Sequence, residues 1–532
     1  MPVNQHFHAA PVAFANLVRL CYTGRRAVDV AQWQSTGLWN QMLRVRPPSS
    51  TLFSFSRAAV SDRLSAISFW LVAGNWSLAF LVAERETMPE IAPRLPRGMR
   101  DILPQQMILR QYVIGVIEKA FQSYGFEPLE TPAVELRSVL MGKYGEDAER
   151  LIYDVRHVGG KEELALRYDL TVPLTRVIAM NPDLRLPFKR YQIAPVWRAE
   201  RPAKGRYRQF YQCDADIVGS ADMLADAEII ALVNDILQRL SFKRYTILIN
   251  HRQLLAEMGA YCGAPAEQAG NLYRSLDKLA KIGEDGVKEE LADAGVGADV
   301  TERLLELVRI QGTNLELIAA MQQRLAGRPA AQRALEELRR LVTYLSEYGV
   351  PESCYQIDFS MVRGLSYYTG PIFETVVQEP KIGSITGGGR YDELIGLFTG
   401  RSLPVTGTTI GIERLIDVIE ELQMYPPSLG RTAAQVLVTI FDAGTRPASL
   451  RLSTALRAAG FNVETFFGEG KLGRQIRYAS EKGIPYVVIL GPDESAAGQV
   501  TLRDLDRSLQ ETVPAESVAE TLRRWQAERA GA

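Results

Sequence analysis

One stretch of the sequence alternates strictly between two kinds of side chain, and this alternation constrains the fold more than any other feature. Downstream of Arg208, every second residue is small or apolar: Tyr211, Cys213, Ala215 and Ile217. The residues between them are Phe210, Gln212, Asp214 and Asp216. Because successive side chains of a β-strand point to opposite faces, the pattern predicts a strand with a core-like face and a polar face.

The same stretch predicts a hairpin. Upstream of the strand, Arg198 and Glu200 also share a face in an extended chain. The connecting segment "RPAKGRYR" carries four basic side chains around a glycine: Arg201, Lys204, Arg206 and Arg208. Two antiparallel strands joined by a mobile cationic loop would present one polar face, basic near the loop and acidic farther from it.

This polar face has two interpretations. Arginine forks suit phosphate oxygens, and Phe210 offers a flat surface for a base. Gln212 and Asp216 would lie about 13 Å apart at roughly 3.3 Å per residue, which suits the amino group and side chain of a cationic amino acid. The alternative is a solvated hairpin with a charged turn. A P-loop is excluded, since no GxxxxGK[ST] occurs and "GEGKLGR" at 468–474 lacks the Ser/Thr and the spacing.

Bulk composition excludes several other classes of protein. The net charge of −1 gives no global attraction to nucleic acid, so a polyanion site must be a local basic patch. The four cysteines form no CxxC pair, which fits a reducing cytoplasm better than a disulfide framework. The four histidines form no HExxH, and we expect no metal site built by protein side chains.

The chain of 532 residues is long enough for three or four domains. Helical periodicity is expected at about 105–124 and 223–240, and almost throughout 253–348. Strands are expected at 125–135, ending at Pro132, and again within 354–377. From about residue 434 the pattern becomes strand–helix–strand–helix–strand, which predicts a separate α/β domain with parallel strands.

Residues 1–87 show no sustained period and differ from the rest. "VAQW" at 30–33 and "VRPP" at 45–48 can be back-translated into the D-loop and T-loop sequences of a transfer-RNA gene. We therefore expect that the natural protein begins at Met88. A genuine leader or a membrane anchor is the alternative, because an apolar run of 17 residues spans Ile67–Ala83, at the lower limit for a membrane span.

Five motifs in order resemble the histidyl-tRNA synthetase family of class II aminoacyl-tRNA synthetases. "GFEPLETPAVE" (125–135) is similar to motif 1, "WRAERP…GRYRQFYQCDADIVG" (197–219) to motif 2 and "GTTIGIERL" (407–415) to motif 3. "VRGLSYYTG" (362–370) and "GGGRYDELIG" (387–396) resemble stretches particular to the histidyl enzymes. The resemblance extends from about Arg97 to the C-terminus.

The resemblance implies an α+β fold: a class II antiparallel-sheet catalytic core with a helical insertion, followed by a C-terminal α/β anticodon-binding domain. The expected division is a non-homologous extension at 1–87, a catalytic domain at 88–250 and 351–430, a helical insertion at 251–350 and an anticodon-binding domain at 431–532. It further implies a cytoplasmic homodimer with Pro132 at its interface, no membrane attachment, and the partners L-histidine, ATP with Mg²⁺, and tRNA(His).

For ATP, the resemblance implies that Arg198 binds the α-phosphate and Glu200 the adenine amino group. Phe210 and Arg414 would sandwich the adenine, and Arg206 would join Arg414 near the outer phosphates.

For histidine, the resemblance implies a set of residues around the amino group, the carboxylate and the ring: Asp169, Leu170, Thr171, Gln212, Asp216, Arg363, Tyr367 and Tyr368. Asp169, Thr171 and Gln212 would hold the α-amino group, and Asp216 and Tyr368 the imidazole. Arg363 and Arg198 are the expected catalytic residues, with Arg363 placed against the α-phosphate and the substrate carboxylate.

Four positions depart from the family pattern. Ser366 stands where many relatives carry Asp, and Ala203 where many carry Gln in the motif 2 loop. Asp169 and Asp216 are one methylene shorter than the Glu of some relatives.

The alternative function is a catalytically inert, histidine-sensing paralogue that assists ATP phosphoribosyltransferase. Such paralogues typically lack the C-terminal domain and have lost active-site arginines, whereas this chain keeps Arg198, Arg363 and Arg414.

Overall fold

A computed structural model describes residues 92–141, 149–203, 205–362, 367–426, 429–468 and 470–530. The expectations for residues 1–87 lie outside the described residues. None of the described helices is both long enough and apolar enough to span a membrane.

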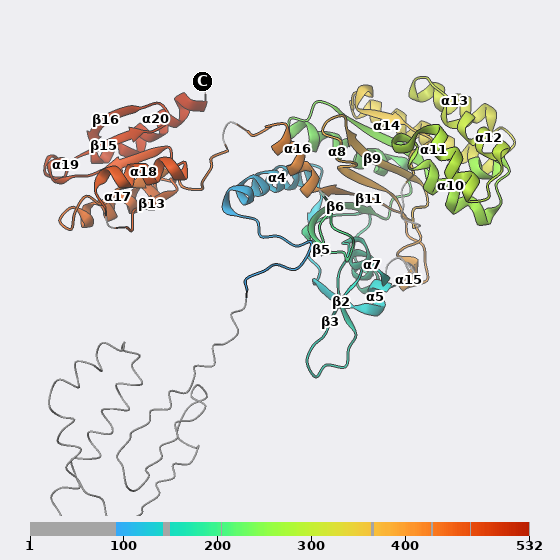
Figure 1. Cartoon of the computed structure of the whole chain (residues 1–532), viewed down its shortest axis with the longest axis horizontal. Coiled ribbons are helices and arrows are strands. Elements are labelled where there is room, and N and C mark those ends of the chain that lie inside the picture. The colour runs from blue at the N-terminus through green and yellow to red at the C-terminus, as the bar shows by residue number, and fades with distance from the viewer. Residues whose placement is uncertain are drawn as a thin grey trace, which may run out of the picture. The chain divides into compact units, whose positions relative to one another are not determined.

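An eight-stranded sheet forms the centre of the first part of the chain (Figure 1). Its strands, in spatial order, are β1 (Glu127–Pro128), β5 (Phe188–Trp197), β6 (Gln209–Val218), β11 (Val405–Gly411), β10 (Thr386–Arg390), β9 (Pro371–Val377), β7 (Tyr245–His251) and β8 (Tyr355–Ile357). Neighbouring strands are antiparallel except at the two edges, where β1 pairs with β5 and β7 with β8 in parallel. The expected antiparallel core is therefore confirmed, with a parallel pair at each edge.

The predicted hairpin is formed by β5 and β6. They pair antiparallel with Val196 opposite Phe210 and Arg190 opposite Asp216. The small and apolar face of β6 packs into the main core, where Cys213, Ala215 and Ile217 are buried. This core is completed by helices α4 (Pro104–Ser123), α8 (Met223–Arg239) and α16 (Ile412–Glu421). The other face of β6 is thus left for the polar side chains.

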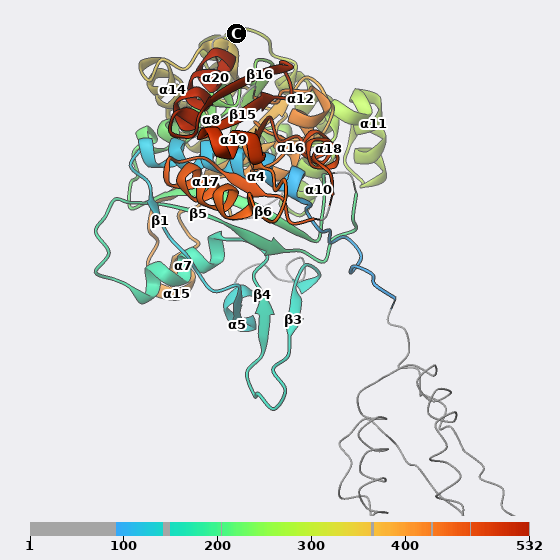
Figure 2. The same ribbon diagram turned by 90° about the vertical axis from the view of Figure 1, so that its left-hand side faces the viewer.

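A small sheet follows motif 1. The expected single strand up to Pro132 is two strands, β1 before that proline and β2 (Val134–Leu136) after it. Strand β2 joins β4 (Leu164–Leu166) and β3 (Tyr153–Val155) in a separate three-stranded sheet. Figure 2 shows β3 and β4 extending away from the helices on the main sheet. The short helices α5 (Arg137–Met141) and α7 (Thr171–Met180) pack together beside this sheet.

The predicted helical segment is confirmed between β7 and β8. It contains α9 (Arg252–Cys262), α10 (Ala269–Leu276), α11 (Leu279–Asp293), α12 (Ala298–Val308), α13 (Asn314–Arg324) and α14 (Pro329–Glu347). Gly263 ends α9 in a left-handed conformation, which glycine adopts without steric cost, and Pro329 opens α14 at its first position. Helix α14 packs against α8 of the catalytic part.

The C-terminal part has its own five-stranded sheet. Its spatial order is β13 (Val463–Thr465), β12 (Val436–Val438), β14 (Tyr486–Ile489), β15 (Gln499–Asp504) and β16 (Leu509–Pro514). The three predicted strands β12, β13 and β14 are parallel, as expected, and are connected by α17 (Arg446–Ala458) and α18 (Leu472–Lys482). The antiparallel pair β15–β16 and the helices α19 (Pro492–Ala497) and α20 (Val518–Ala530) were not predicted.

Candidate active site

A pocket of about 190 Å³ opens on the polar face of the hairpin. Its walls come from motif 2, from motif 3 and from the segment around β10. It contains all five expected ATP residues and one expected histidine residue: Arg198, Glu200, Arg206, Phe210, Arg414 and Gln212. The structure therefore brings together residues that are more than two hundred positions apart in the sequence.

The arginines among the expected ATP residues are held in place by other groups. The Arg198 guanidinium lies 5.2 Å from the centre of the Phe210 ring, and its Nε donates a hydrogen bond to the Tyr168 carbonyl at 2.9 Å. Arg206 Nε lies 3.2 Å from Glu200 Oε2. Arg414 Nη1 donates to the carbonyl of Ser384. The Arg198 guanidinium thus lies over the aromatic ring on which a base can stack, and Arg206 and Arg414 line the same pocket.

Glu413, which the sequence analysis did not single out, supports this end of the pocket. It forms ion pairs with Arg110 and with Arg100, the latter at 2.5 Å, and accepts a hydrogen bond from the Tyr211 amide at 3.4 Å. Arg100 Nη1 in turn donates to the Tyr207 hydroxyl at 3.0 Å. The basic residues of "PRGMRD" were the available signal, but their partner lies more than three hundred residues away.

Asp169, Leu170 and Thr171 lie at the start of α7. Asp169 Oδ1 accepts a hydrogen bond from the Val172 amide at 3.0 Å, so the carboxylate caps the helix. Burial raises the pKa of Asp169, and this amide opposes the shift. The Leu170 carbonyl accepts a hydrogen bond from Arg190 Nη2 at 3.2 Å. The loop is therefore anchored to β5.

Gln212 and Asp214 lie side by side on β6. Gln212 Nε2 donates to Asp214 Oδ1 at 3.3 Å and to Thr409 Oγ1 of β11 at 3.1 Å. Gln212 Oε1 is buried and has no hydrogen-bond partner in the described part of the chain. A buried acceptor of this kind suits an ammonium group.

Asp216 is held by two side chains that the sequence analysis missed. Arg190 Nη2 lies 2.7 Å from Asp216 Oδ2, and the Tyr391 hydroxyl donates to Oδ1. Burial raises the pKa of Asp216 and raises that of Asp214 to about 7. Arg190 acts against the shift at both aspartates, and the Tyr391 hydroxyl does so at Asp216. Arg190 pairs with Asp216 across β5 and β6, so the two side chains lie on the same face of the hairpin. The alternation of side chains along β5 could have pointed to Arg190 in the sequence.

Tyrosines close the Asp216 end. The Tyr367 and Tyr368 rings lie 4.5 Å apart between centres, and Tyr391 stands edge-on to Tyr367 at 5.6 Å. Tyr368 is buried and Tyr367 is half-buried. Tyr391 contacts the Asp216 carboxylate, and the three rings together present flat apolar surface that suits an aromatic ligand.

Glycines form the floor beneath this end. A Cβ at Gly407 would lie 1.9 Å from Asp216 Oδ1, and one at Gly388 would lie 2.1 Å from the Gly407 carbonyl. A Cβ at Gly389 would lie 2.9 Å from the Tyr368 ring. Only glycine leaves the Asp216 carboxylate and the Tyr368 ring in these positions.

The expected catalytic Arg363 lies outside the described residues, as do Ser366 and Lys204. Their assignments stay predictions. Among the described residues, no group of three or more His, Cys, Asp or Glu side chains is placed to hold a metal ion.

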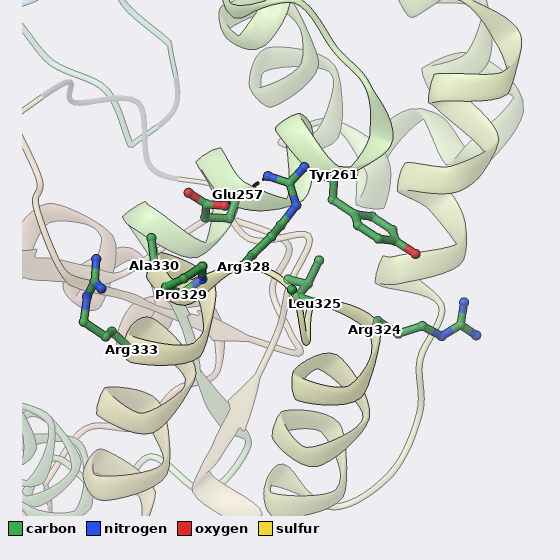
Figure 3. Close-up of a pocket in the computed structure, with 9 residues that line it drawn as sticks. Glu257, Tyr261, Arg324, Leu325, Arg328, Pro329, Ala330 and Arg333 are labelled. Carbon is green, nitrogen blue, oxygen red and sulfur yellow. Dashed lines mark hydrogen bonds and ion pairs between the residues drawn. The ribbon is translucent and has the colours of Figure 1, made fainter.

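A larger cavity of about 590 Å³ lies in the helical insertion. Figure 3 shows its lining from α9, α13 and α14, with Arg328 beside Tyr261 and Arg333 on the opposite side of the view. Arg328 is paired with Glu257 at 3.1 Å. This cavity contains none of the expected site residues, so its greater volume does not make it the reaction site.

Comparisons with known proteins agree with this geometry. The family model described as histidyl-tRNA synthetase matches residues 98–415, and the model described as anticodon binding domain matches residues 435–525. The histidine–tRNA ligase of Gloeobacter violaceus is 44% identical over 448 residues, covering 78% of this chain and 95% of the relative.

Solved structures show the same fold. The histidyl-tRNA synthetase of Nostoc sp. PCC 7120 has a TM-score of 0.74 at 35% identity and covers 82% of this chain and 100% of its own. A Bacillus halodurans protein titled ATP phosphoribosyltransferase regulatory subunit/histidyl-tRNA synthetase has a TM-score of 0.62 at 23% identity, covers 73% of this chain and 96% of its own, and shows the fold alone. The chain belongs to the histidyl-tRNA synthetase family, and it joins a class II catalytic core to a C-terminal anticodon-binding domain.

Proposed function

We propose that the protein is a histidine–tRNA ligase, which activates L-histidine with ATP and transfers it to the 3′ end of tRNA(His). The supporting observation is the order of side chains on β6. Phe210, Gln212 and Asp216 follow one another along one face of the strand, beneath Arg198 at one end and beside Tyr368 at the other. An adenine on Phe210 and an amino acid beyond Gln212 would meet on this face.

In the first step, a carboxylate oxygen of histidine attacks the α-phosphorus of ATP. The new bond forms the adenylate, and the bond to the bridging oxygen breaks to release pyrophosphate. No general base is needed, because the attacking carboxylate is already ionised. Two anions approach each other, so fixed cations stabilise the transition state. Arg198 and Arg363 are proposed for this role at the α-phosphate.

The remaining polar groups hold the substrates. Gln212 Oε1 and the Asp169 carboxylate would accept hydrogen bonds from the α-ammonium group, together with Thr171. Asp216 would accept one ring N–H, with Tyr368 and Tyr367 against the ring. ATP would enter with Mg²⁺, which proteins usually bind through one or two carboxylates and the substrate phosphates. Of the two carboxylates in the pocket wall, Glu200 pairs with Arg206, and Glu413 pairs with Arg100 and Arg110.

The larger organisation is proposed on the same basis. The catalytic domain comprises 88–250 and 351–430, the helical insertion 251–350 and the anticodon-binding domain 431–532, with residues 1–87 outside them. We place Pro132 at the interface of a cytoplasmic homodimer. Sedimentation of the purified protein would detect the dimer. A monomer at micromolar concentration would contradict the dimer.

The function is tested by ATP–pyrophosphate exchange. The purified protein should show exchange that depends on histidine, and it should charge tRNA(His). A histidine sensor without catalysis should show neither reaction.

Arg363→Ala should slow adenylate formation on the order of 10²-fold or more, because it removes a fixed cation from the transition state. The surface substitution Arg339→Ala is the matched control, and an unchanged rate in Arg363→Ala would contradict the catalytic role.

A further inference from the structure

A fully buried arginine lies behind the histidine end of the site. Arg190 is 0% exposed and stands on β5 directly opposite Asp216 of β6. Its guanidinium contacts Asp216 Oδ2 at 2.7 Å and the Leu170 carbonyl at 3.2 Å, while Tyr391 donates to the other oxygen of Asp216. Asp216 therefore has an ion pair at Oδ2 and a hydrogen bond at Oδ1, and the two contacts orient the carboxylate.

The titratable groups around Arg190 come from three elements. Asp214 and Asp216 face it from β6, Asp169 from the loop before α7, and Tyr391 from the segment after β10. Arg198 also acts on Asp169, but its own contacts are the Phe210 ring and the Tyr168 carbonyl at the ATP end.

These groups leave little negative charge for a substrate side chain. Burial raises the pKa of Asp214 to about 7, so this carboxyl holds a proton below that pH. Asp169 is left to balance the α-ammonium group, and Arg190 already balances Asp216. A hairpin with two aspartates suggested a cationic amino acid, but the buried arginine reverses that expectation.

We propose that Arg190 is a specificity-determining positioning residue, which balances and orients Asp216 so that the site selects the neutral imidazole ring over imidazolium and other cationic side chains. The proposal rests on histidine as the substrate. A neutral ring still donates one N–H to the Asp216 carboxylate. A cationic ring would be attracted by the negative charge of Asp216, but the positive charge of Arg190 already balances it, so the cation gains no net attraction while Arg190 is present.

The test is the pH dependence of KM for histidine in pyrophosphate exchange. With an imidazole pKa near 6.5, the neutral fraction of histidine rises about fourfold from pH 6 to pH 8, and the cationic fraction falls more than tenfold. The unmodified protein should therefore show a KM that falls about fourfold. In Arg190→Met the site should select the cationic ring, so KM for histidine should rise on the order of tenfold from pH 6 to pH 8. KM for ATP should be unchanged by the substitution.

Two variants and one analogue separate charge selection from a structural effect. Arg190→Lys keeps the positive charge, and Asp214→Asn keeps the Arg190–Asp216 pair, so KM should fall with pH in both. Triazolylalanine has a ring that stays neutral in this range, and its KM in the unmodified protein should stay constant.

A KM for histidine that rises with pH in the unmodified protein would overturn the proposal, even if Arg190→Met does not fold. So would a falling KM in Arg190→Met. Absence of any histidine-dependent exchange in the unmodified protein would contradict the ligase function instead.

Discussion

At the scale of single residues, the site is a row of buried polar groups whose partners lie on neighbouring strands. Phe210, Gln212 and Asp216 could be predicted because the period of a strand is two residues, which places them on one face without knowledge of the rest of the fold. Arg190, Tyr391 and Thr409 could not be assigned in this way. Their contacts depend on strand register and on loops, which no local pattern specifies.

Asp214 is expected to destabilise the protein at high pH. Its pKa is about 7 in the folded protein and 3.8 in its ordinary state, so folding favours the protonated form. The contribution of this carboxyl to the free energy of unfolding is fully present below pH 3.8 and is lost as the pH rises through about 7. Asp214→Asn should therefore unfold like the unmodified protein at pH 4 and be more stable by about 2–4 kcal/mol at pH 8. Urea unfolding at the two pH values measures the difference, and an equal change at both would contradict this role.

Gly407 is expected to tolerate no side chain. In Gly407→Ala the new Cβ would lie 1.9 Å from Asp216 Oδ1 and 2.9 Å from the Ala215 carbonyl, so Asp216 must move. Because misplacement by about 1 Å can cost 10²-fold in rate, kcat/KM for histidine should fall on that order. Gly473→Ala is the matched control, since its Cβ would meet nothing within 4 Å in helix α18. Equal exchange rates in the two variants would contradict the steric argument.

At the scale of elements, the helices could be predicted better than the short strands. An amphipathic helix repeats its apolar face several times within its own sequence, and α4 and α8 begin and end close to the predicted residues. The strands β15 and β16 were missed because their sequences are rich in polar residues, although most of β15 is buried and only β16 is largely exposed. Their identity as strands depends on pairing with each other and with β14.

One buried ion pair joins two elements beneath the site. Arg390 at the end of β10 pairs with Asp226 of α8, and it also donates to the carbonyls of Ser220 at 2.9 Å and Asp222 at 3.3 Å. Both side chains are almost fully buried. The pair therefore ties α8 to the strand that carries the glycine floor.

Removing one partner of this pair should be costly. Asp226→Asn leaves the Arg390 charge buried without its counter-charge, and it should lower the free energy of unfolding by about 3–5 kcal/mol. Glu336→Gln, which breaks an exposed pair with Arg339, should leave the melting temperature unchanged. Differential scanning calorimetry compares the two, and similar melting temperatures would show that the buried pair is not needed for stability.

At the scale of the whole molecule, the described residues contain separate hydrophobic cores. Val436, Val488, Leu502, Leu522 and Trp525 pack only with other residues of the C-terminal part. The main core of the catalytic part ends with partly buried residues up to Leu429. Each part can therefore bury its apolar side chains without the other.

A chain ending at Gly430 is expected to fold and to keep histidine-dependent pyrophosphate exchange. Its charging of tRNA(His) should fall on the order of tenfold or more, because each lost contact with an RNA base is worth about 1–3 kcal/mol. Exchange and charging measured on the same preparation test this, with the full chain as control. Loss of exchange together with charging would show that the catalytic part depends on the C-terminal part.

The strand order of the catalytic sheet has a consequence for synthesis on the ribosome. Strand β6 lies between β5 and β11, and Val218 pairs with Val405. The ribosome makes about 5–20 residues per second, so β6 has an open edge for roughly 10–40 s before its second neighbour exists. The helical insertion is translated entirely within that interval. Among the interior strands of this sheet, the strand that carries the substrate residues thus waits longest for its second neighbour, and meanwhile its edge can pair with other nascent chains.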